Sequence, residues 1–194
     1  WYRIAQTIVA TTTFDDTSAT IPTTNLSDIA GSYIPPPSAK YIISDTNRLV
    51  MAGAWETSTA TGQTAVKTNR VWFTPVLGST DEGDDERIPN TVDQQNWIDV
   101  GNEGPVTGLI GPLYGDIYVL KADSVFKLTP TGDVTTPYRP LQISWSIGCV
   151  DQRVSTVGVD GRGAPAVWFG SSDSLYQVTA GGVTDVRDSV SRDL

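Results

Sequence analysis

A pattern that recurs about every 50 residues constrains this chain more than any other feature. Asp123 and Asp173 are 50 residues apart (173 − 123), and each is followed by Ser. The segments 115–129 and 165–179 share an alternating run, this Asp-Ser turn and a second alternating run that ends in Thr. A period of about 40–50 residues made of short strands predicts small sheets that bury their faces by stacking on one another.

Two tryptophans support the same repeat. Trp97 and Trp145 are 48 residues apart (145 − 97), and each is followed three or four positions later by a glycine, Gly101 or Gly148. The two extra residues in the later copy fit the Gly-rich turn at 160–163. We therefore expect two similar units joined in series.

A looser third copy precedes them. We predict strands at 41–44, 48–53 and 69–74, because these runs are short, rich in β-branched and aromatic residues and bounded by polar segments. Asp45-Thr46-Asn47 stands in the place of the Asp-Ser turn.

The composition favours the same class of fold. Thr occurs 25 times and Val 20 times, whereas Leu occurs 10 times and Glu and Lys 4 times each. β-Branched residues suit strands, and good helix formers are scarce. We predict an all-β fold with propeller-like repeats of short antiparallel strands. The alternative is a β-sandwich whose hairpins resemble one another by chance.

The expected domain organisation has two parts. Residues 1–34 are interpreted as the end of a preceding β-module and a linker, and the proline run at 35–37 marks the boundary. Residues 35–194 form a propeller-like domain of about three repeats, at about 39–90, 94–140 and 144–194. Three repeats cannot close a ring of at least four blades, so this domain is predicted to be incomplete. Because position 1 is Trp, we interpret the chain as a piece of a longer or processed product.

Charge and residue counts exclude several classes of function. The chain has no His and one Cys, which excludes an internal disulfide, a Cys/His zinc site and Ser-His-Asp catalysis. The net charge of −9 argues against a general grip on phosphate backbones. No run approaches the ~18 apolar residues of a membrane span.

No residue is predicted to be catalytic, to bind a cofactor or to hold a metal. Asp123 and Asp173 are expected to bond their own backbone at turns. The run Asp81–Glu86 has five carboxylates but lacks the spacing of a calcium loop, so we expect a solvated loop. Trp72 and Trp168 lie inside alternating strands and are expected to fill the core, and Cys149 is expected to be a small buried hydrophobe.

Short runs along the chain resemble the propeller region of tail and neck proteins of tailed bacteriophages, nearest to the tail tubular protein B or nozzle group. The runs are Pro36–Ile42, Asn47–Gly53, Asn69–Thr74, Ser146–Val150, Ala166–Val178 and Val186–Val190. Tyr2–Thr7 and Phe14–Asp16 resemble the end of the β-domain before that propeller.

The resemblance implies a structural virion protein of a phage tail or neck. Copies would form a homo-oligomeric ring around the DNA exit path and contact other tail or neck proteins. DNA would pass through the lumen without specific binding, and an acidic lumen wall would repel it. The alternatives are a carbohydrate- or receptor-binding β-module on a virion surface and, less favoured, a propeller hydrolase.

Overall fold

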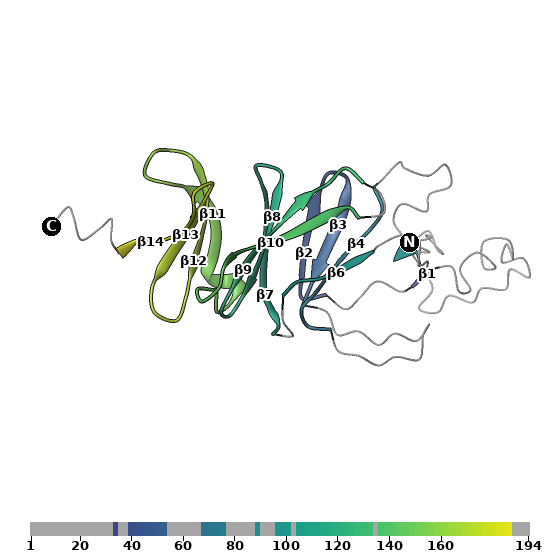
Figure 1. Ribbon diagram of the computed structural model, residues 1–194, viewed down its shortest axis with the longest axis horizontal. Helices are drawn as coiled ribbons and strands as arrows, with labels where there is room; N and C mark the ends of the chain where they lie inside the picture. Colours follow the sequence, from purple (N-terminus) through teal and green to yellow (C-terminus); the bar gives the residue numbers. More distant parts are fainter. Residues whose placement is uncertain are drawn as a thin grey trace, which may run out of the picture.

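The computed structural model describes residues 33–34, 39–53, 67–76, 88–89, 96–101, 104–133 and 136–187. These residues form three four-stranded antiparallel sheets and one two-stranded sheet. Figure 1 shows the three larger sheets side by side along the long axis, in the order of the chain. Most of the predicted segment 1–34 and the proline run lie outside the described residues. The all-β prediction is confirmed, and the three sheets do not close on themselves within the described part of the chain.

In each large sheet the spatial order of the strands follows the chain. The first sheet contains β2 (Tyr41–Asp45), β3 (Arg48–Ala52), β4 (Arg70–Phe73) and β6 (Trp97–Asp99). The second contains β7 (Val106–Leu113), β8 (Asp116–Lys121), β9 (Val125–Pro130) and β10 (Tyr138–Ser144). The third contains β11 (Ser155–Val159), β12 (Pro165–Gly170), β13 (Leu175–Thr179) and β14 (Gly182–Asp185).

Two short elements complete the fold. β1 (Tyr33–Ile34) pairs with β5 (Ile88–Pro89) in the two-stranded sheet, beyond the first sheet in Figure 1. A 3-10 turn, η2 (Gln152–Val154), lies between the second and third sheets in the chain. Trp97 begins the last strand of the first sheet, whereas the predicted second repeat began near residue 94.

The hairpin turns correct one detail of the predicted repeat. Thr46 and Asn47 join β2 to β3 with positive φ at both residues, and Tyr114 and Gly115 join β7 to β8 in the same way. Such two-residue turns match the twist of the strands they connect. The Asp-Ser turns instead join the second strand of a sheet to the third. Asp45-Thr46-Asn47 therefore lies one hairpin earlier than the sequence predicts.

The strand register shows how closely the three sheets correspond. In the first sheet Val50 pairs with Phe73 and Met51 with Trp72. The same ladder positions are held in the second sheet by Tyr118–Lys127 and Val119–Phe126, and in the third by Trp168–Gln177 and Phe169–Tyr176. Residues at the same ladder position therefore lie on equivalent faces of the three sheets, because side chains alternate along a strand.

The core consists mainly of two clusters between neighbouring sheets. The first lies between the first and second sheets and includes Val50, Val71, Phe73, Leu109, Ile117, Val119 and Leu128. The second lies between the second and third sheets and includes Ile110, Tyr118, Leu120, Val125, Val167, Phe169 and Val178. The second sheet is thus covered on both faces, which explains the unbroken apolar run Ile117–Leu120 in an antiparallel strand.

Two glycines allow the connecting segments to lie close to the second sheet. A Cβ on Gly148 would overlap the carbonyl oxygen of Lys121 and would lie 2.6 Å from the amide nitrogens of Asp123 and Ser124. Gly101 has a φ of +64°, and a Cβ there would lie 2.5 Å from the Phe126 ring. These contacts give a physical reason for the glycine that follows each repeated tryptophan.

Candidate functional site

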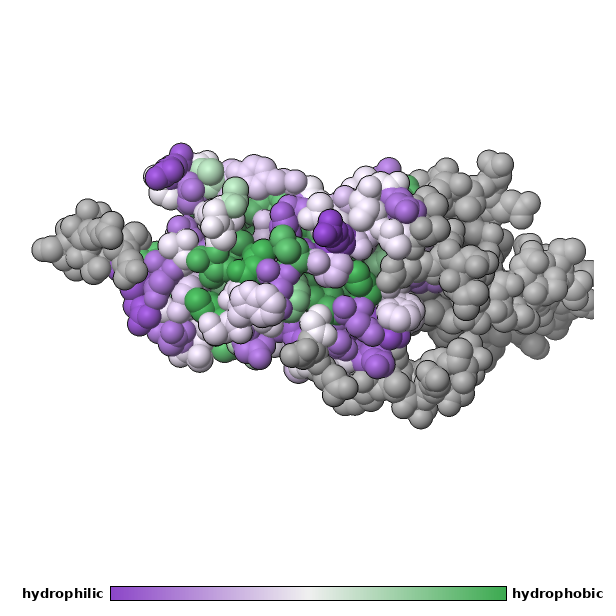
Figure 2. Space-filling view, viewed as in Figure 1, coloured by the Kyte–Doolittle hydropathy of each residue, from purple (hydrophilic) through white to green (hydrophobic). Residues whose placement is uncertain are grey.

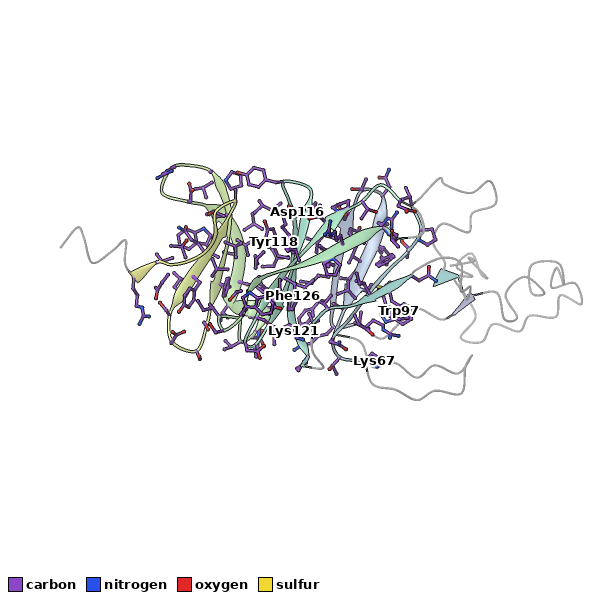
Figure 3. All side chains as sticks on the ribbon, in the orientation of Figure 1. Lys67, Trp97, Asp116, Tyr118, Lys121 and Phe126 are labelled. Atoms are coloured by element: carbon purple, nitrogen blue, oxygen red, sulfur yellow. The ribbon has the colours of Figure 1, made fainter. Side chains whose placement is uncertain are left out.

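Four side chains form a polar and aromatic cluster on the outer face of the first sheet, the face turned away from the second sheet. Alternation along β4 places Arg70 and Trp72 on one face, and alternation along β6 places Trp97 and Asp99 there too. The register brings Arg70 opposite Asp99 and Trp72 opposite Trp97. Figure 3 shows Trp97 on this outer side of the sheet. We call these four residues the Arg70 cluster.

The guanidinium group of Arg70 is held by two kinds of contact. Its Nε donates to Oδ1 of Asp99 at 2.6 Å, and its Nη2 donates to Oδ2 at 3.0 Å. The same group stacks 3.5 Å from the centroid of the Trp97 ring and 5.7 Å from that of Trp72. A bidentate carboxylate and an aromatic plane fix the planar fork of an arginine. The cluster therefore presents a rigid mixed surface rather than a mobile charge.

Apart from the exposed Ser44, the strand residues on the rest of this outer face are apolar. Met51 and Trp72 are buried and pack with Ala39, while Ile42 and Leu49 are exposed. The rings of Trp97 and Trp72 pack edge-to-face with their centroids 6.5 Å apart, and 37 % of the surface of Trp97 is exposed. An apolar patch with an aromatic centre and a fixed polar pair is typical of a contact surface for another macromolecule.

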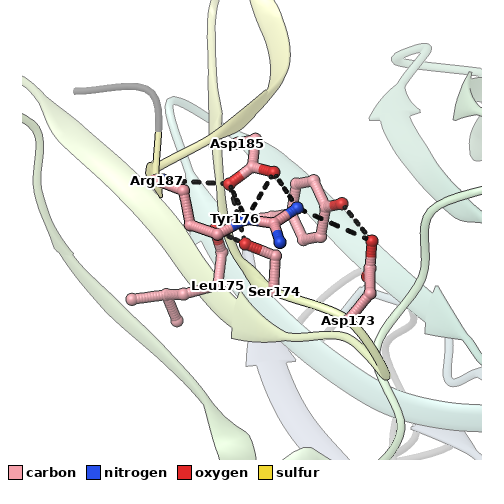
Figure 4. Close-up of polar contacts among 6 residues, drawn as sticks. All are labelled: Asp173, Ser174, Leu175, Tyr176, Asp185 and Arg187. Atoms are coloured by element: carbon pink, nitrogen blue, oxygen red, sulfur yellow. Dashed lines mark hydrogen bonds and ion pairs between the residues drawn. The ribbon is translucent and has the colours of Figure 1, made fainter. Parts of the chain in front are cut away.

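A second polar cluster lies at the edge of the third sheet (Figure 4). The Tyr176 hydroxyl donates to Asp173 at 3.0 Å, and the Ser174 hydroxyl donates to Asp185 at 2.7 Å. Asp185 also pairs with Arg187 at 2.8 Å. Hydrogen bonds from Arg187 and then from Ser174 lower the pKa of Asp185. The cluster ties the β12–β13 turn to β14 and is a structural clamp.

The repeated aspartates act at their turns through side chains. The carboxylate of Asp123 accepts from the Ser124 hydroxyl at 3.0 Å, and that of Asp173 accepts from Tyr176. Backbone bonds close these turns separately, between Lys121 and Ser124 and between Ser171 and Ser174. The expectation that the two carboxylates bond their own backbone is therefore wrong, because neighbouring hydroxyl groups take that role.

A buried polar pair between the first two sheets has no counterpart in the sequence-based predictions. The Tyr138 hydroxyl donates to Oδ2 of Asp45 at 2.7 Å, and Asp45 is only 4 % exposed. The guanidinium of Arg48 lies 5.6 Å from the Tyr138 ring and 5.9 Å from the Phe73 ring. Sequence reasoning interpreted Asp45 only as a turn residue, because its partner lies 93 positions away.

The predictions for individual apolar residues have mixed outcomes. Trp72 is buried, and Cys149 is buried in the cluster between the second and third sheets, as expected. Burial raises the pKa of the Cys149 thiol. Trp168 is only half-buried and does not join that cluster. Its pairing with Gln177 places it on the face opposite Val167 and Phe169, so the prediction of core filling is wrong for Trp168.

Within the described ranges, no group of three or more Cys, Asp and Glu side chains is arranged to hold a metal ion. No helix in these ranges has the length and apolar character needed to span a membrane. The acidic run Asp81–Glu86 lies outside the described residues, so its prediction as a solvated loop stays a prediction.

The Arg70 cluster could have been found from an alternation argument. Arg-Val-Trp at 70–72 and Trp-Ile-Asp at 97–99 each put their outer two side chains on one face of a strand. Pairing the two strands was the missing step, since 24 residues (73–96) lie between the two runs.

A scan against protein-family models and a search of curated proteins both find no match for this chain.

Proposed function

We propose that this chain is a structural protein of a phage tail or neck, with no catalytic role, whose sheets act as assembly units of a ring around the DNA exit path. The observation that carries the proposal is the stack of three four-stranded sheets that share one register. The chain passes from the last strand of one sheet to the first strand of the next. This connection is the one that propeller blades use, and we extend the proposal to a propeller-like arrangement.

The charge distribution bears on the DNA path. The described residues contain ten Lys and Arg and nine Asp and Glu, so the sheets are close to neutral. The remaining residues hold 3 bases and 13 acids (13 − 10 and 22 − 9), which accounts for the net charge of −9. If acidic groups repel DNA in a lumen, these come from segments outside the three sheets.

Electron microscopy and light scattering on the purified chain test the proposal. We expect ring-shaped particles with a mass that is an integer multiple of 20.8 kDa. We also expect no retention of duplex DNA at physiological ionic strength, because phosphate binding requires clustered Lys and Arg. A chain that stays monomeric at high concentration, or that binds DNA tightly, would contradict the proposal.

Carbohydrate or receptor binding is the second candidate, and exposed aromatic side chains favour it. Trp145 is 79 % exposed in the segment after β10, and amphipathic rings of this kind are enriched at binding surfaces. Glycan-array binding that disappears in Trp145→Ala and persists in Tyr114→Ala would support this function. Tyr114 is a suitable control because it is also well exposed, at 64 %, but lies at a different turn.

A further inference from the structure

The two ends of the sheet stack have faces that no other described sheet covers. The second sheet packs on the first with one face and on the third with the other. The first sheet uses only the face that carries Val50 and Phe73, and the third uses only the face that carries Val167 and Phe169. Figure 2 shows apolar residues gathered in a band across the middle of the described part of the molecule.

The shared register shows which face of the second sheet corresponds to the outer face of the third sheet. Trp168 and Leu175 hold the ladder positions that Tyr118 and Val125 hold in the second sheet. Tyr118 and Val125 are buried against the third sheet, and Figure 3 shows Tyr118 on that side of β8. Leu175 is 47 % exposed, and Trp168 is half-buried. The third sheet thus repeats two apolar positions of this packing face, with Thr156 and Gly170 in place of Ile110 and Leu120, and no described sheet packs on it.

Gln177 lies on the same outer face of the third sheet and has an unsatisfied polar atom. Its Oε1 is buried and has no hydrogen-bond partner among the described residues. The equivalent residue in the second sheet, Lys127, pairs with Asp116 at 3.0 Å. Ala166 holds the position of Asp116 in the third sheet and offers no polar side chain. A donor from outside the sheet would remove the cost of this buried acceptor.

The outer face of the first sheet offers the complementary contact surface. Leu49, Met51 and Trp72 on its outer face correspond to Ile117, Val119 and Phe126, with which the second sheet packs on the first. Met51 and Trp72 are already buried with Ala39, so the exposed contact residues are Ile42, Leu49 and Trp97. The outer face of the first sheet is therefore equivalent to the face with which the second sheet packs on the first.

We infer that the outer face of the third sheet of one copy docks on the outer face of the first sheet of a second copy. The contact continues the existing stack with the same polarity, so it is head-to-tail. Such a contact gives a closed ring if the rotation between copies divides a full turn, and a filament otherwise. The inference rests on the proposed ring and adds the two surfaces that join its members.

Two charge-introducing variants test the inference by complementation. Trp168→Arg blocks the face on the third sheet, and Leu49→Arg blocks the face on the first sheet. Each variant alone is expected to weaken self-association by at least about 30-fold, the size of a central interface substitution. Mixed together, they still have one intact face of each kind and should form a 1:1 dimer that grows no further.

Tyr114→Arg is the matched control. It makes the same aromatic-to-Arg change on an exposed residue of the β7–β8 turn in the second sheet, away from both end faces, and should assemble like the wild type. Circular dichroism and thermal melting show whether each variant is folded. Light scattering and analytical ultracentrifugation measure the masses.

The outcomes separate the inference from the proposed function. A 1:1 dimer in the mixture supports the inference. Rings that persist in both single variants overturn the inference and leave the proposed ring intact. Loss of assembly in the single variants without dimers in the mixture overturns the head-to-tail contact. A wild-type chain that is monomeric at all concentrations overturns both.

Discussion

At the scale of single residues, the Asp45–Tyr138 pair connects the first two sheets through a hydrogen bond in the core. Both residues are at most 4 % exposed, and the donor–acceptor distance is 2.7 Å. A carboxylate taken out of water needs such a partner, because an unsatisfied buried acceptor costs its full desolvation penalty. The hydroxyl of Thr46 also donates to Asp45, at 3.0 Å, so the carboxylate has two donors.

We predict that Tyr138→Phe lowers the free energy of unfolding by about 1–3 kcal/mol, because it leaves Asp45 with one donor fewer in the core. Urea denaturation followed by fluorescence measures the change. Tyr114→Phe, on an exposed turn residue, should leave the stability unchanged. Equal stabilities of Tyr138→Phe and wild type would show that the buried bond contributes nothing net.

The same pair predicts a loss of stability at alkaline pH. Burial, and then the hydrogen bond to Asp45, raise the pKa of Tyr138 above its ordinary value near 10. The unfolded chain therefore releases this proton at lower pH than the folded chain does. Stability is fully present below pH about 10 and falls as the pH rises above it. The decline should be shallower in Tyr138→Phe, as measured by urea denaturation at pH 8 to 11. An identical slope would contradict the assignment.

Gly148 gives a second prediction for a single residue. Gly148→Ala should destabilise the fold by at least about 2 kcal/mol, because the new methyl group would meet backbone atoms that cannot move aside easily. Gly161→Ala is the control, since nothing lies within 4 Å of a Cβ there. Thermal unfolding measures both. A mild effect at Gly148 would mean that the turn at 121–124 shifts at little cost.

At the scale of elements, a side chain joins the 3-10 turn η2 to the first strand of the second sheet. Oε1 of Gln152 accepts from the backbone N–H of Leu109 at 2.6 Å, and its Nε2 donates to the Leu109 carbonyl at 3.0 Å. The Thr107 hydroxyl donates to the carbonyl of Cys149 nearby, also at 2.6 Å. β7 is an edge strand of the second sheet. These bonds give its polar groups partners that an open edge would otherwise lack.

We predict that Gln152→Ala exposes the Leu109 amide and lowers stability by about 1–2 kcal/mol, because two backbone groups lose their partner. Amide hydrogen exchange at Leu109 measures the first effect and urea denaturation the second. Arg153→Ala is the control on the same turn, because its side chain is 88 % exposed and pairs only at the surface. Unchanged exchange at Leu109 would contradict the role of Gln152.

Part of the larger sheets follows closely from local patterns, whereas no strand was predicted for β6, β7, β10, β11 and β14. The predicted strands at 41–44, 48–53 and 69–74 correspond to β2, β3 and β4 within one or two residues. The short alternating runs and the turn residues between them suffice for this, because both signals act over a few positions. The looser copy was misaligned by one hairpin, since a turn motif alone does not tell which two strands it joins.

At the scale of the whole molecule, neutral sheets are combined with acidic segments. Each copy carries a net charge of −9. Copies therefore repel one another at low ionic strength, while the proposed docking faces carry apolar and aromatic side chains, among them Leu49, Trp97, Trp168 and Leu175. Screening shortens the range of this repulsion to about 3 Å at 1 M salt but leaves apolar contacts in place.

We therefore predict that self-association strengthens between 0.05 and 0.5 M NaCl, a range over which the screening length falls from above to below about 10 Å. Sedimentation velocity at fixed protein concentration measures the shift in mass. Leu49→Arg should show no such gain, because its docking face stays blocked at any salt concentration. Association that weakens with salt would indicate ion pairs rather than apolar faces at the contact.

The sequence by itself determined the all-β class, the runs that form β2, β3, β4, β8, β9, β12 and β13, and the repeat that places Asp123 and Asp173 at equivalent turns. These depend on neighbours within a few residues. Only the tertiary structure decided that Arg70 meets Asp99, that Asp45 meets Tyr138 and that Trp168 lies outside the core. Each of these depends on strand register and on which sheet covers which face, and a shift of one residue in register would reverse the face of every side chain.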